Sequence, residues 1–220
     1  EEACQRAGRD ASEVTLIAVS KTKPVPMLEE AYEGGARDFG ENKVQEIQAK
    51  YGSLPDDVRW HMIGHLQRNK VKQVVGHVAL IQSVGSLELL DEIEKVAAAR
   101  GLVQDILLEV NIGGEASKSG ISPEELSALA AQAVGSPHVR LRGLMAIPPV
   151  AAGPDGNRPF FAKMRQLYVD IRSQMDDNKT SFDCLSMGMS GDFEDAVREG
   201  ATLVRVGTAL FGPRPPMHKG

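Results

Sequence analysis

The sequence predicts an α/β protein of the (β/α)8 TIM barrel class. Short runs rich in valine, isoleucine and leucine alternate with amphipathic segments along the chain. Strands that are apolar on both faces are typical of parallel sheets covered by helices. Eight such runs occur in 220 residues, which is the number of units in a barrel of about this length. An open, doubly wound sheet is the alternative architecture.

The runs predicted as strands are bounded by glycine, asparagine or serine, as strands that end in turns usually are. Each is followed by a longer segment that can cross back over the sheet, so parallel pairing is expected. The runs cover residues 14–20, 37–40, 59–64, 78–84, 104–111, 139–145, 182–188 and 202–207.

Helical periodicity is clear in two of the intervening segments. Residues 86–101 place apolar side chains close to every 3.6 residues and stop at Gly101. Residues 160–175 repeat the amphipathic pattern. The opening residues, EEACQRAGRD, start in the middle of a helical pattern, which is compatible with an N-terminal helix that begins upstream of Glu1.

A further helix is expected over residues 122–135. Ser122 stands before Pro123 and is followed three residues later by Glu125. This is the capping-box pattern, with proline at the first helical position. We therefore predict that the helix starts directly after Ser122.

The chain is expected to form a single domain over residues 1–220. Residues 146–159 are rich in proline and glycine, but the alternation of strands and helices resumes after them. This segment is therefore interpreted as the loop after the sixth strand and not as a domain boundary.

Composition excludes several classes of protein. A hydrophobic content of 42% and a charged content of 25% are typical of a folded soluble protein, and the net charge of -5 disfavours nucleic-acid binding. No apolar run approaches the ~18 residues of a membrane span, and no signal peptide is visible. Cys4 and Cys184 form neither a disulfide framework nor a metal site. They indicate reduced thiols in a cytoplasmic protein, with Cys184 in the core.

Chemistry in this fold belongs to the C-terminal ends of the strands and to the loops that follow them. Those positions carry a ring of mostly polar residues drawn from distant segments. The ring consists of Lys21, Asn42, His61, His65, Ser83, Asn111, Met145, Ser190, Gly207 and Thr208.

The loops after the seventh and eighth strands predict a phosphate site. The sequences GMSGD and VGTALFG combine glycines, which let the backbone approach a ligand closely, with the hydroxyls of Ser190 and Thr208. Ordinary capping of two helices is the alternative. Arg205 interrupts the apolar run TLVRVG, and a guanidinium there needs a ligand or a structural ion pair.

Lys21 ends the apolar run VTLIAVS. Desolvation lowers the pKa of a lysine, and a neutral amine forms Schiff bases with aldehydes. Opposite a phosphate site, this points to a sugar phosphate or to pyridoxal 5′-phosphate, although an exposed lysine at a strand end is the plain alternative. Lys23 has the same strand parity, so spacing does not choose between the two lysines. We expect Lys23, which precedes Pro24, to be solvated.

The chain resembles a known protein family. It is similar almost end to end to the pyridoxal phosphate homeostasis proteins (the YggS/PROSC-like group), which are related in fold to the barrel domain of alanine racemase. The matching segments, in order, are AVSKTKP, ARDFGENKVQE, WHMIGHLQRNK, QSVGS, LLEVNIGGEASKSG, GLMAIPP, LSMGMSGDFEDAV and VRVGTALFGPR.

The resemblance implies a role for each matching residue of the cofactor site. Lys21 would hold pyridoxal phosphate as a Schiff base, and Ser190, Gly207 and Thr208 would hold its phosphate. Arg205 would lie beside the pyridine nitrogen or the phosphate. Beside the nitrogen, an arginine disfavours a protonated ring and weakens the electron sink.

Three further positions are implied to lie against the cofactor: Asn42, His61 and Met187. The family often has tyrosine in the segment FGENYVQE, where this chain has Lys43. Any contact that the tyrosine makes in relatives is therefore in doubt here.

Racemisation needs acid–base groups on both faces of the cofactor. Lys21 would serve one face. Alanine racemase supplies a tyrosine from a second domain of a partner chain, and we expect no such domain in a sequence that ends at Gly220. Tyr32, Tyr51 and Tyr168 all fall in predicted outer helices.

The resemblance therefore predicts a non-catalytic carrier that buffers or delivers pyridoxal phosphate in the cytoplasm and affects amino-acid metabolism. Its expected partners are the cofactor itself and pyridoxal-phosphate-dependent apo-enzymes, and a monomer is expected. An amino-acid racemase is the first alternative function. A Schiff-base aldolase acting on a sugar phosphate is the second.

Overall fold

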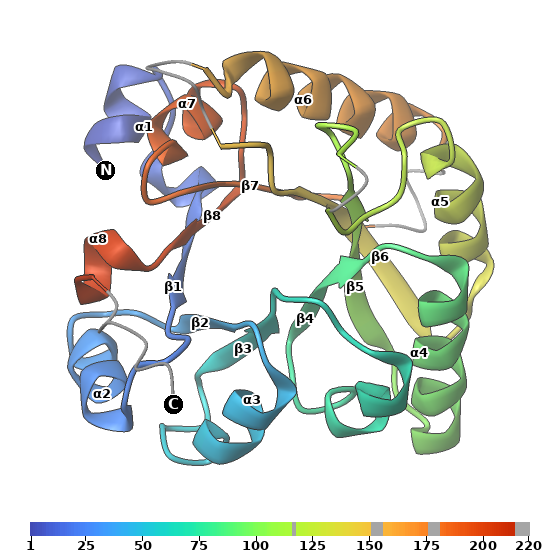
Figure 1. Ribbon diagram of the computed structural model, residues 1–220, viewed down its shortest axis with the longest axis horizontal. Helices are drawn as coiled ribbons and strands as arrows, with labels where there is room; N and C mark the ends of the chain where they lie inside the picture. The colour runs from blue at the N-terminus through green and yellow to red at the C-terminus, as the bar shows by residue number, and fades with distance from the viewer. Residues whose placement is uncertain (116–117, 151–155, 176–180, 214–220) are drawn as a thin grey trace.

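Eight parallel strands close into one barrel in the order β1 to β8 (Figure 1). The computed structural model describes residues 1–115, 118–150, 156–175 and 181–213. Each strand pairs in parallel with the next one along the chain, and β8 pairs with β1. The predicted α/β barrel is confirmed, and the open sheet is excluded because it would leave β1 and β8 unpaired.

The strands coincide with the predicted runs to within two residues at either end. Alternation along each strand sends one side chain into the barrel and the next toward the helices. The strands are β1 (Thr15–Val19), β2 (Asp38–Glu41), β3 (Arg59–Met62), β4 (Leu80–Val84), β5 (Gln104–Val110), β6 (Val139–Ala146), β7 (Cys184–Met189) and β8 (Leu203–Val206).

Helices surround the barrel in Figure 1 and fill most of the crossovers. The crossover from β3 to β4 instead contains a 3-10 helix. The helices are α1 (Glu2–Arg6), η1 (Ala11–Glu13), α2 (Val25–Glu33), α3 (Val44–Lys50), η2 (Arg68–Gln73), α4 (Leu87–Arg100), α5 (Leu126–Gly135), α6 (Arg158–Ser173), α7 (Phe193–Arg198) and α8 (Thr208–Phe211). In the described parts of the chain, no helix has both the length and the apolar character that crossing a membrane requires.

The start of α5 differs from the prediction. Ser122 and Glu125 do pair, but the Ser122 hydroxyl donates to the Glu125 carboxylate at 2.8 Å. The Glu125 amide bonds to the Ser122 carbonyl at 3.2 Å instead of to the hydroxyl. The residues before Leu126 therefore form turns, and α5 starts at Leu126 with Glu125 as its N-cap.

Two apolar clusters hold the fold together. The larger fills the space between the barrel and the helices. The smaller lies inside the barrel, because its members take the inward positions of different strands; they are Ile17, Leu80, Leu107, Met145 and Leu203. The barrel is therefore a packed core, and a ligand is expected at its C-terminal end.

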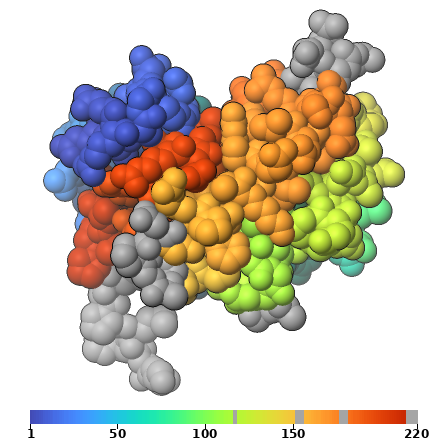
Figure 2. Space-filling model, turned by 90° about the horizontal axis from the view of Figure 1, so that it is seen from above, coloured from blue at the N-terminus to red at the C-terminus, as the bar shows by residue number. Residues whose placement is uncertain are grey.

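The N-terminal segment packs on the outside of the barrel against α7 and the residues that follow it. Figure 2 shows the blue N-terminal residues against the red residues of the C-terminal part, with α6 in orange beside them. Arg6 pairs with Glu194 of α7 at 2.9 Å, and Arg9 donates to the carbonyls of Val197 and Ala201 at 2.9 and 2.7 Å. These contacts support the closure of β1 against β8.

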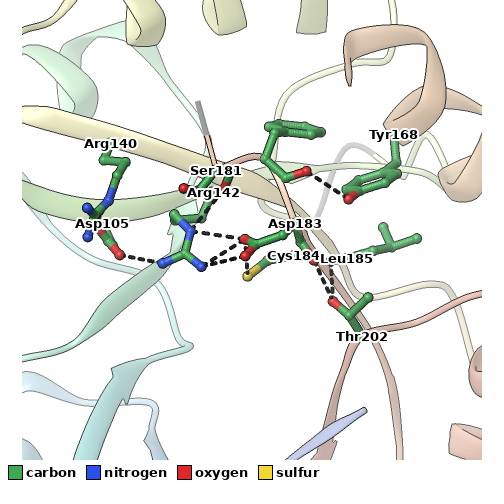
Figure 3. Close-up of polar contacts among 10 residues, drawn as sticks. Asp105, Arg140, Arg142, Tyr168, Ser181, Asp183, Cys184, Leu185 and Thr202 are labelled. Carbon is green, nitrogen blue, oxygen red and sulfur yellow. Dashed lines mark hydrogen bonds and ion pairs between the residues drawn. The ribbon is translucent and has the colours of Figure 1, made fainter. Parts of the chain in front are cut away.

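The N-terminal ends of β5, β6 and β7 are joined by a cluster of charged residues (Figure 3). Arg142 donates to Asp105 and to Asp183, each at 2.8 Å, and Arg140 donates to Asp105 at 2.6 Å. Burial alone would lower the pKa of Arg142, but these carboxylates outweigh it and raise the pKa. The cluster lies at the end of the barrel opposite the strand C-termini, where residues serve stability.

Cys184 packs against the apolar cluster inside the barrel, in line with the expectation of a small core residue. It is partly buried beside Asp183, to which its thiol donates at 3.4 Å. Burial, together with Asp183, raises the pKa of the thiol to about 12. The thiol therefore stays protonated and unreactive at neutral pH.

Candidate functional site

A cavity of about 350 Å³ opens at the C-terminal ends of the strands. This volume lies in the range of small-molecule sites, roughly 300 to 1,000 Å³. The cavity brings together most of the residues predicted for a cofactor site, although they come from distant segments. Those residues are Lys21, Asn42, Ser190, Arg205, Gly207 and Thr208.

Lys21 reaches the cavity because the backbone turns sharply after it. Thr22 has a φ of 64°, a left-handed conformation that is strained for a β-branched residue. The Thr22 amide donates to Glu46 at 2.6 Å, which holds the turn. Strain of this kind persists only where the surrounding structure enforces it, and it is common at functional sites.

Lys23 is buried, contrary to the expectation that it would be solvated. Its ammonium group donates to the carbonyls of Phe211, Gly212 and Pro213 at 2.9, 3.2 and 3.2 Å, and the residue is only 9% exposed. The left-handed Thr22 breaks the strand alternation, so the shared parity of the two lysines does not carry through the turn. Lys21 lines the cavity, and Lys23 closes the end of α8.

A buried ion pair between Lys50 and Glu41 supports the backbone at Ser20, directly before the turn at Lys21 and Thr22. Lys50 donates to Glu41 at 2.7 Å and to the Ser20 carbonyl at 2.8 Å, and the Ser20 hydroxyl donates to Glu41 at 2.6 Å. Burial raises the pKa of Glu41, and the hydrogen bonds from Lys50 and Ser20 oppose this. The sequence signal of this support is an acidic residue, Glu41, at the end of a buried strand.

Asn42 is held at the cavity by a close approach of two backbones. A Cβ added to Gly64 would lie 2.3 Å from the Asn42 carbonyl oxygen, so only glycine fits there. Both residues line the cavity. Lys43 is the exposed N-cap residue of α3 and is not part of the cavity wall.

The loops after β7 and β8 meet at Ser190. Its hydroxyl oxygen accepts hydrogen bonds from the backbone amides of Gly207 and Ala209 at 3.2 and 3.3 Å. Two amides therefore converge on one oxygen beside Thr208, which is an arrangement that a phosphate oxygen can use. The amide of Ala209 was not among the predicted residues, because backbone donors leave no sign in a sequence.

Arg205 is buried inside the barrel, with 3% of its surface exposed, and lines the cavity. It donates to the Ser186 hydroxyl at 2.6 Å and to the Ala146 carbonyl at 2.9 Å. Burial lowers the pKa of Arg205 to about 10, so the guanidinium is still charged at neutral pH. Within the described residues its hydrogen-bond partners are neutral, in contrast to the structural ion pair considered from the sequence.

A chain of hydrogen bonds leads from Arg205 through the barrel interior. Ser186 donates to Gln82 at 2.6 Å, and the Gln82 amide nitrogen lies 3.2 Å from Nδ1 of His61. Nε2 of His61 lies 2.9 Å from Asp38. Burial would raise the pKa of Asp38, but its hydrogen bonds to His61 and to Arg59 outweigh it and lower the pKa to about 2.

The two ends of this chain determine the direction of every hydrogen bond in it. Arg205 can only donate, and an ionised Asp38 can only accept. Ser186 must therefore donate to the Gln82 oxygen, and Gln82 must donate to Nδ1 of His61. His61 is then neutral, with its proton on Nε2.

His61 and Met187 are the two predicted site residues that the structure does not bring to the cavity wall. His61 points into the barrel but is used in the hydrogen-bond chain. Met187 takes the outward position of β7 and packs in the cluster between barrel and helices. Strand alternation explains this, because the inward neighbour on β7 is Ser186.

Comparison with known proteins assigns the chain to a family. The family model for the alanine racemase N-terminal domain matches residues 2–215. The pyridoxal phosphate homeostasis protein of Aquifex aeolicus is 46% identical over 97% of this chain and 93% of its own length. That of Pseudomonas aeruginosa is 45% identical over 97% of this chain and 90% of its own.

The chain belongs to the pyridoxal phosphate homeostasis protein family. A solved relative, PipY of Synechococcus elongatus with pyridoxal phosphate bound, is 38% identical. It superimposes with a TM-score of 0.82 over 96% of this chain and 98% of its own. The resemblance that the sequence motifs indicated is therefore confirmed at the level of the family and the fold.

In this member of the pyridoxal phosphate homeostasis family, the cavity also contains a carboxyl group that the sequence analysis did not single out. Glu109 of β5 lines the cavity and is 6% exposed. Burial raises the pKa of Glu109 to about 7, although the charge of Arg205 opposes the rise. An acidic residue in the apolar run DILLEVN was the available signal, equivalent to Arg205 in TLVRVG.

Glu109→Gln is expected to change how stability depends on pH. The pKa of Glu109 is about 7 in the folded protein and 4.5 when unperturbed, so the folded state binds the proton more tightly. Stability due to this group is therefore lost as the pH rises from 4.5 to 7, by about 3 kcal/mol in all. Glu109→Gln should lack this loss and unfold at higher urea concentration than the natural chain at pH 8.

Urea unfolding of the cofactor-free protein at pH 5 and pH 8 measures the effect. Glu88→Gln, at an exposed acidic position on α4, is the matched control. Parallel pH profiles for the natural chain and Glu109→Gln would contradict a raised pKa at this site.

Proposed function

We propose that this protein holds pyridoxal 5′-phosphate as a Schiff base on Lys21 and buffers or delivers it to pyridoxal-phosphate-dependent apo-enzymes. The observation that carries the proposal is that Lys21 and the Ser190, Gly207 and Thr208 cradle line one cavity. An aldehyde and a phosphate at opposite ends of one ligand match these two features. The names of the curated relatives and the cofactor bound to PipY support the same ligand.

The residues present fit this cofactor. The amides of Gly207 and Ala209 converge on the Ser190 hydroxyl oxygen, and Thr208 lines the same cavity wall. These groups would bind the phosphate, and Lys21 would supply the amine. When bound, the cofactor offers an aldehyde carbon to that amine and an electron sink to an amino acid.

Arg205 would lie beside the pyridine nitrogen. Its two donor bonds to Ser186 and Ala146 hold the guanidinium in one orientation. A guanidinium has no lone pair to accept a proton and does not release one at neutral pH. It would therefore keep the ring nitrogen unprotonated, which weakens the electron sink and favours holding the cofactor over chemistry on it.

The positions of the tyrosines support a carrier that does not catalyse. Tyr32 lies on α2, Tyr51 caps α3, and Tyr168 of α6 donates to the Phe182 carbonyl at 3.0 Å. The cavity wall, as far as the structure describes it, contains no tyrosine. Glu109 and His65 do line the cavity and can carry protons. They favour amino-acid racemisation as the second candidate function.

Borohydride reduction followed by peptide mapping tests the proposal. The purified protein is expected to be coloured, to lose its visible band on reduction and to carry the reduced adduct on Lys21. Incubation with alanine in deuterium oxide tests the second function, and no exchange of the α-proton is expected from a carrier. A colourless protein that does not take up added pyridoxal phosphate would contradict the proposal.

The proposed function also implies a cellular location, an oligomeric state and a domain extent. We propose a cytoplasmic monomer in which residues 1–220 act as one cofactor-binding domain. Held in this way, the cofactor would be shielded from adventitious amines until an apo-enzyme accepts it. The balance of amino-acid metabolism would then depend on this protein through the supply of cofactor.

A further inference from the structure

A second cavity adjoins the one described above. It has a volume of about 430 Å³ and lies between η2 and the first turn of α4. The two cavities have a common wall made by His65, Glu109 and Ser119. We propose that this second cavity is a binding site for a small oxyanion, the carboxylate or phosphate group of a metabolite, separate from the cofactor site.

Ser83 is the observation that points to a ligand. The residue is 4% exposed and lines the second cavity. Its hydroxyl oxygen has no hydrogen-bond partner among the residues that the structure describes. A buried hydroxyl without a partner destabilises a fold, and natural proteins keep few of them unless a ligand or water satisfies the group.

The first turn of α4 supplies further donors beside Ser83. The Ser86 hydroxyl accepts from the Leu89 amide at 3.2 Å, which caps this fourteen-residue helix. The amides of Leu87 and Glu88 precede the first residue that can bond within the helix, so they have no intrahelical acceptor. The positive end of the helix dipole and these amides favour a negative group in the cavity.

Arg68 lies on the same cavity wall and is exposed. Its guanidinium can therefore move to a ligand and pair with two oxygens of a carboxylate or phosphate. Gly85 allows the wall to close on the other side, because a Cβ there would lie 2.9 Å from the Cα of Gly120. Gly85 and Gly120, far apart in sequence, thus meet at this cavity.

Two carboxyl groups also line the cavity and bear on the charge of the ligand. Glu88 is exposed, so its side chain can turn to solvent. Glu109 is buried, and its raised pKa lets it keep a proton that it can donate to an oxyanion. Neither group prevents an anion from binding at the Ser83 and α4 end.

Nuclear magnetic resonance of the backbone amides of the full chain tests the proposal. Inorganic phosphate and sodium acetate are titrated separately at constant ionic strength. The expected result is a saturable shift of the Gly85 to Leu89 amides with at least one of them. A response to phosphate alone identifies a phosphate ligand, and a response to acetate alone identifies a carboxylate. The Gly207 and Ala209 amides report the cofactor cavity separately, so the two sites can fail independently.

Ser83→Ala and Arg68→Gln are each expected to weaken that binding by about tenfold or more, as the loss of a hydrogen bond to an anion does. Lys72→Gln removes the same charge from η2 outside the cavity and should leave the affinity unchanged. Ser83→Ala should fold normally, because it deletes a hydroxyl that has no partner. A shift that does not saturate, that occurs only at Gly207 and Ala209, or that is unaffected by both variants would overturn the proposal.

Discussion

Lys21→Ala is expected to abolish reducible attachment of pyridoxal phosphate and to weaken its binding by at least about 100-fold, or about 2.7 kcal/mol. The phosphate cradle at Ser190 and Gly207 would remain, so weak binding without a visible band should persist. The free energy of unfolding of the cofactor-free protein should change little, because Lys21 lies at the cavity and not in the core. Absorbance, borohydride reduction and equilibrium dialysis measure these results.

Lys23→Ala is the matched control, two residues along the chain. It should keep the adduct on Lys21 but lose stability by about 1 to 3 kcal/mol, because it leaves the carbonyls of Phe211 and Gly212 without their buried donor. The two lysines are thus expected to give opposite results in binding and in stability. An adduct that moves to Lys23 in Lys21→Ala, with undiminished affinity, would show that the assignment is wrong.

Gln82→Leu is expected to lower the free energy of unfolding by about 3 kcal/mol. Leucine is similar in volume but leaves the Ser186 hydroxyl proton without an acceptor and Nδ1 of His61 without a donor. Because Ser186 holds Arg205, the change should also loosen the guanidinium in the cofactor cavity. Urea unfolding measures the first effect, and the visible spectrum of the cofactor-bound protein measures the second.

Gln82→His is the variant that separates hydrogen bonding from packing. One imidazole nitrogen can accept from Ser186 while the other donates to His61, so the chain of hydrogen bonds can be restored. Stability and spectrum should therefore return toward those of the natural protein. If Gln82→Leu proved as stable as the natural chain, the interior chain would not be a stabilising unit.

Parts of the site could be predicted from the sequence, because they are polar residues or glycines that interrupt or directly follow apolar strand sequences. The lysine after VTLIAVS, the hydroxyls and glycines of the last two loops and the arginine inside TLVRVG are all local irregularities. Barrel topology then places strand C-termini at one end, whatever the intervening helices contain. Lys21, Ser190 and Arg205 therefore meet in the structure as the pattern predicted.

Other parts depended on contacts between distant segments. Ser186 and Met187 are neighbours in the same apolar run of the sequence. Only the way β7 is turned in the barrel decides which of the two side chains faces inward. Glu109 acquires its raised pKa from burial, and Arg205, nearly a hundred residues away in sequence, opposes the rise. Ser83 was predicted to lie in one ring with Lys21, but it lines the second cavity.

The sequence by itself determined the fold class, the order of the strands, the family and the identity of the groups available for chemistry, because these depend on periodicity and on residue type. Only the tertiary structure decided which of two lysines faces the cavity, because one strained residue, Thr22, reverses the alternation between them. It also decided which nitrogen of His61 donates, because folding brings its hydrogen-bond partners together. It raised the pKa of Glu109, because folding buries that carboxyl group.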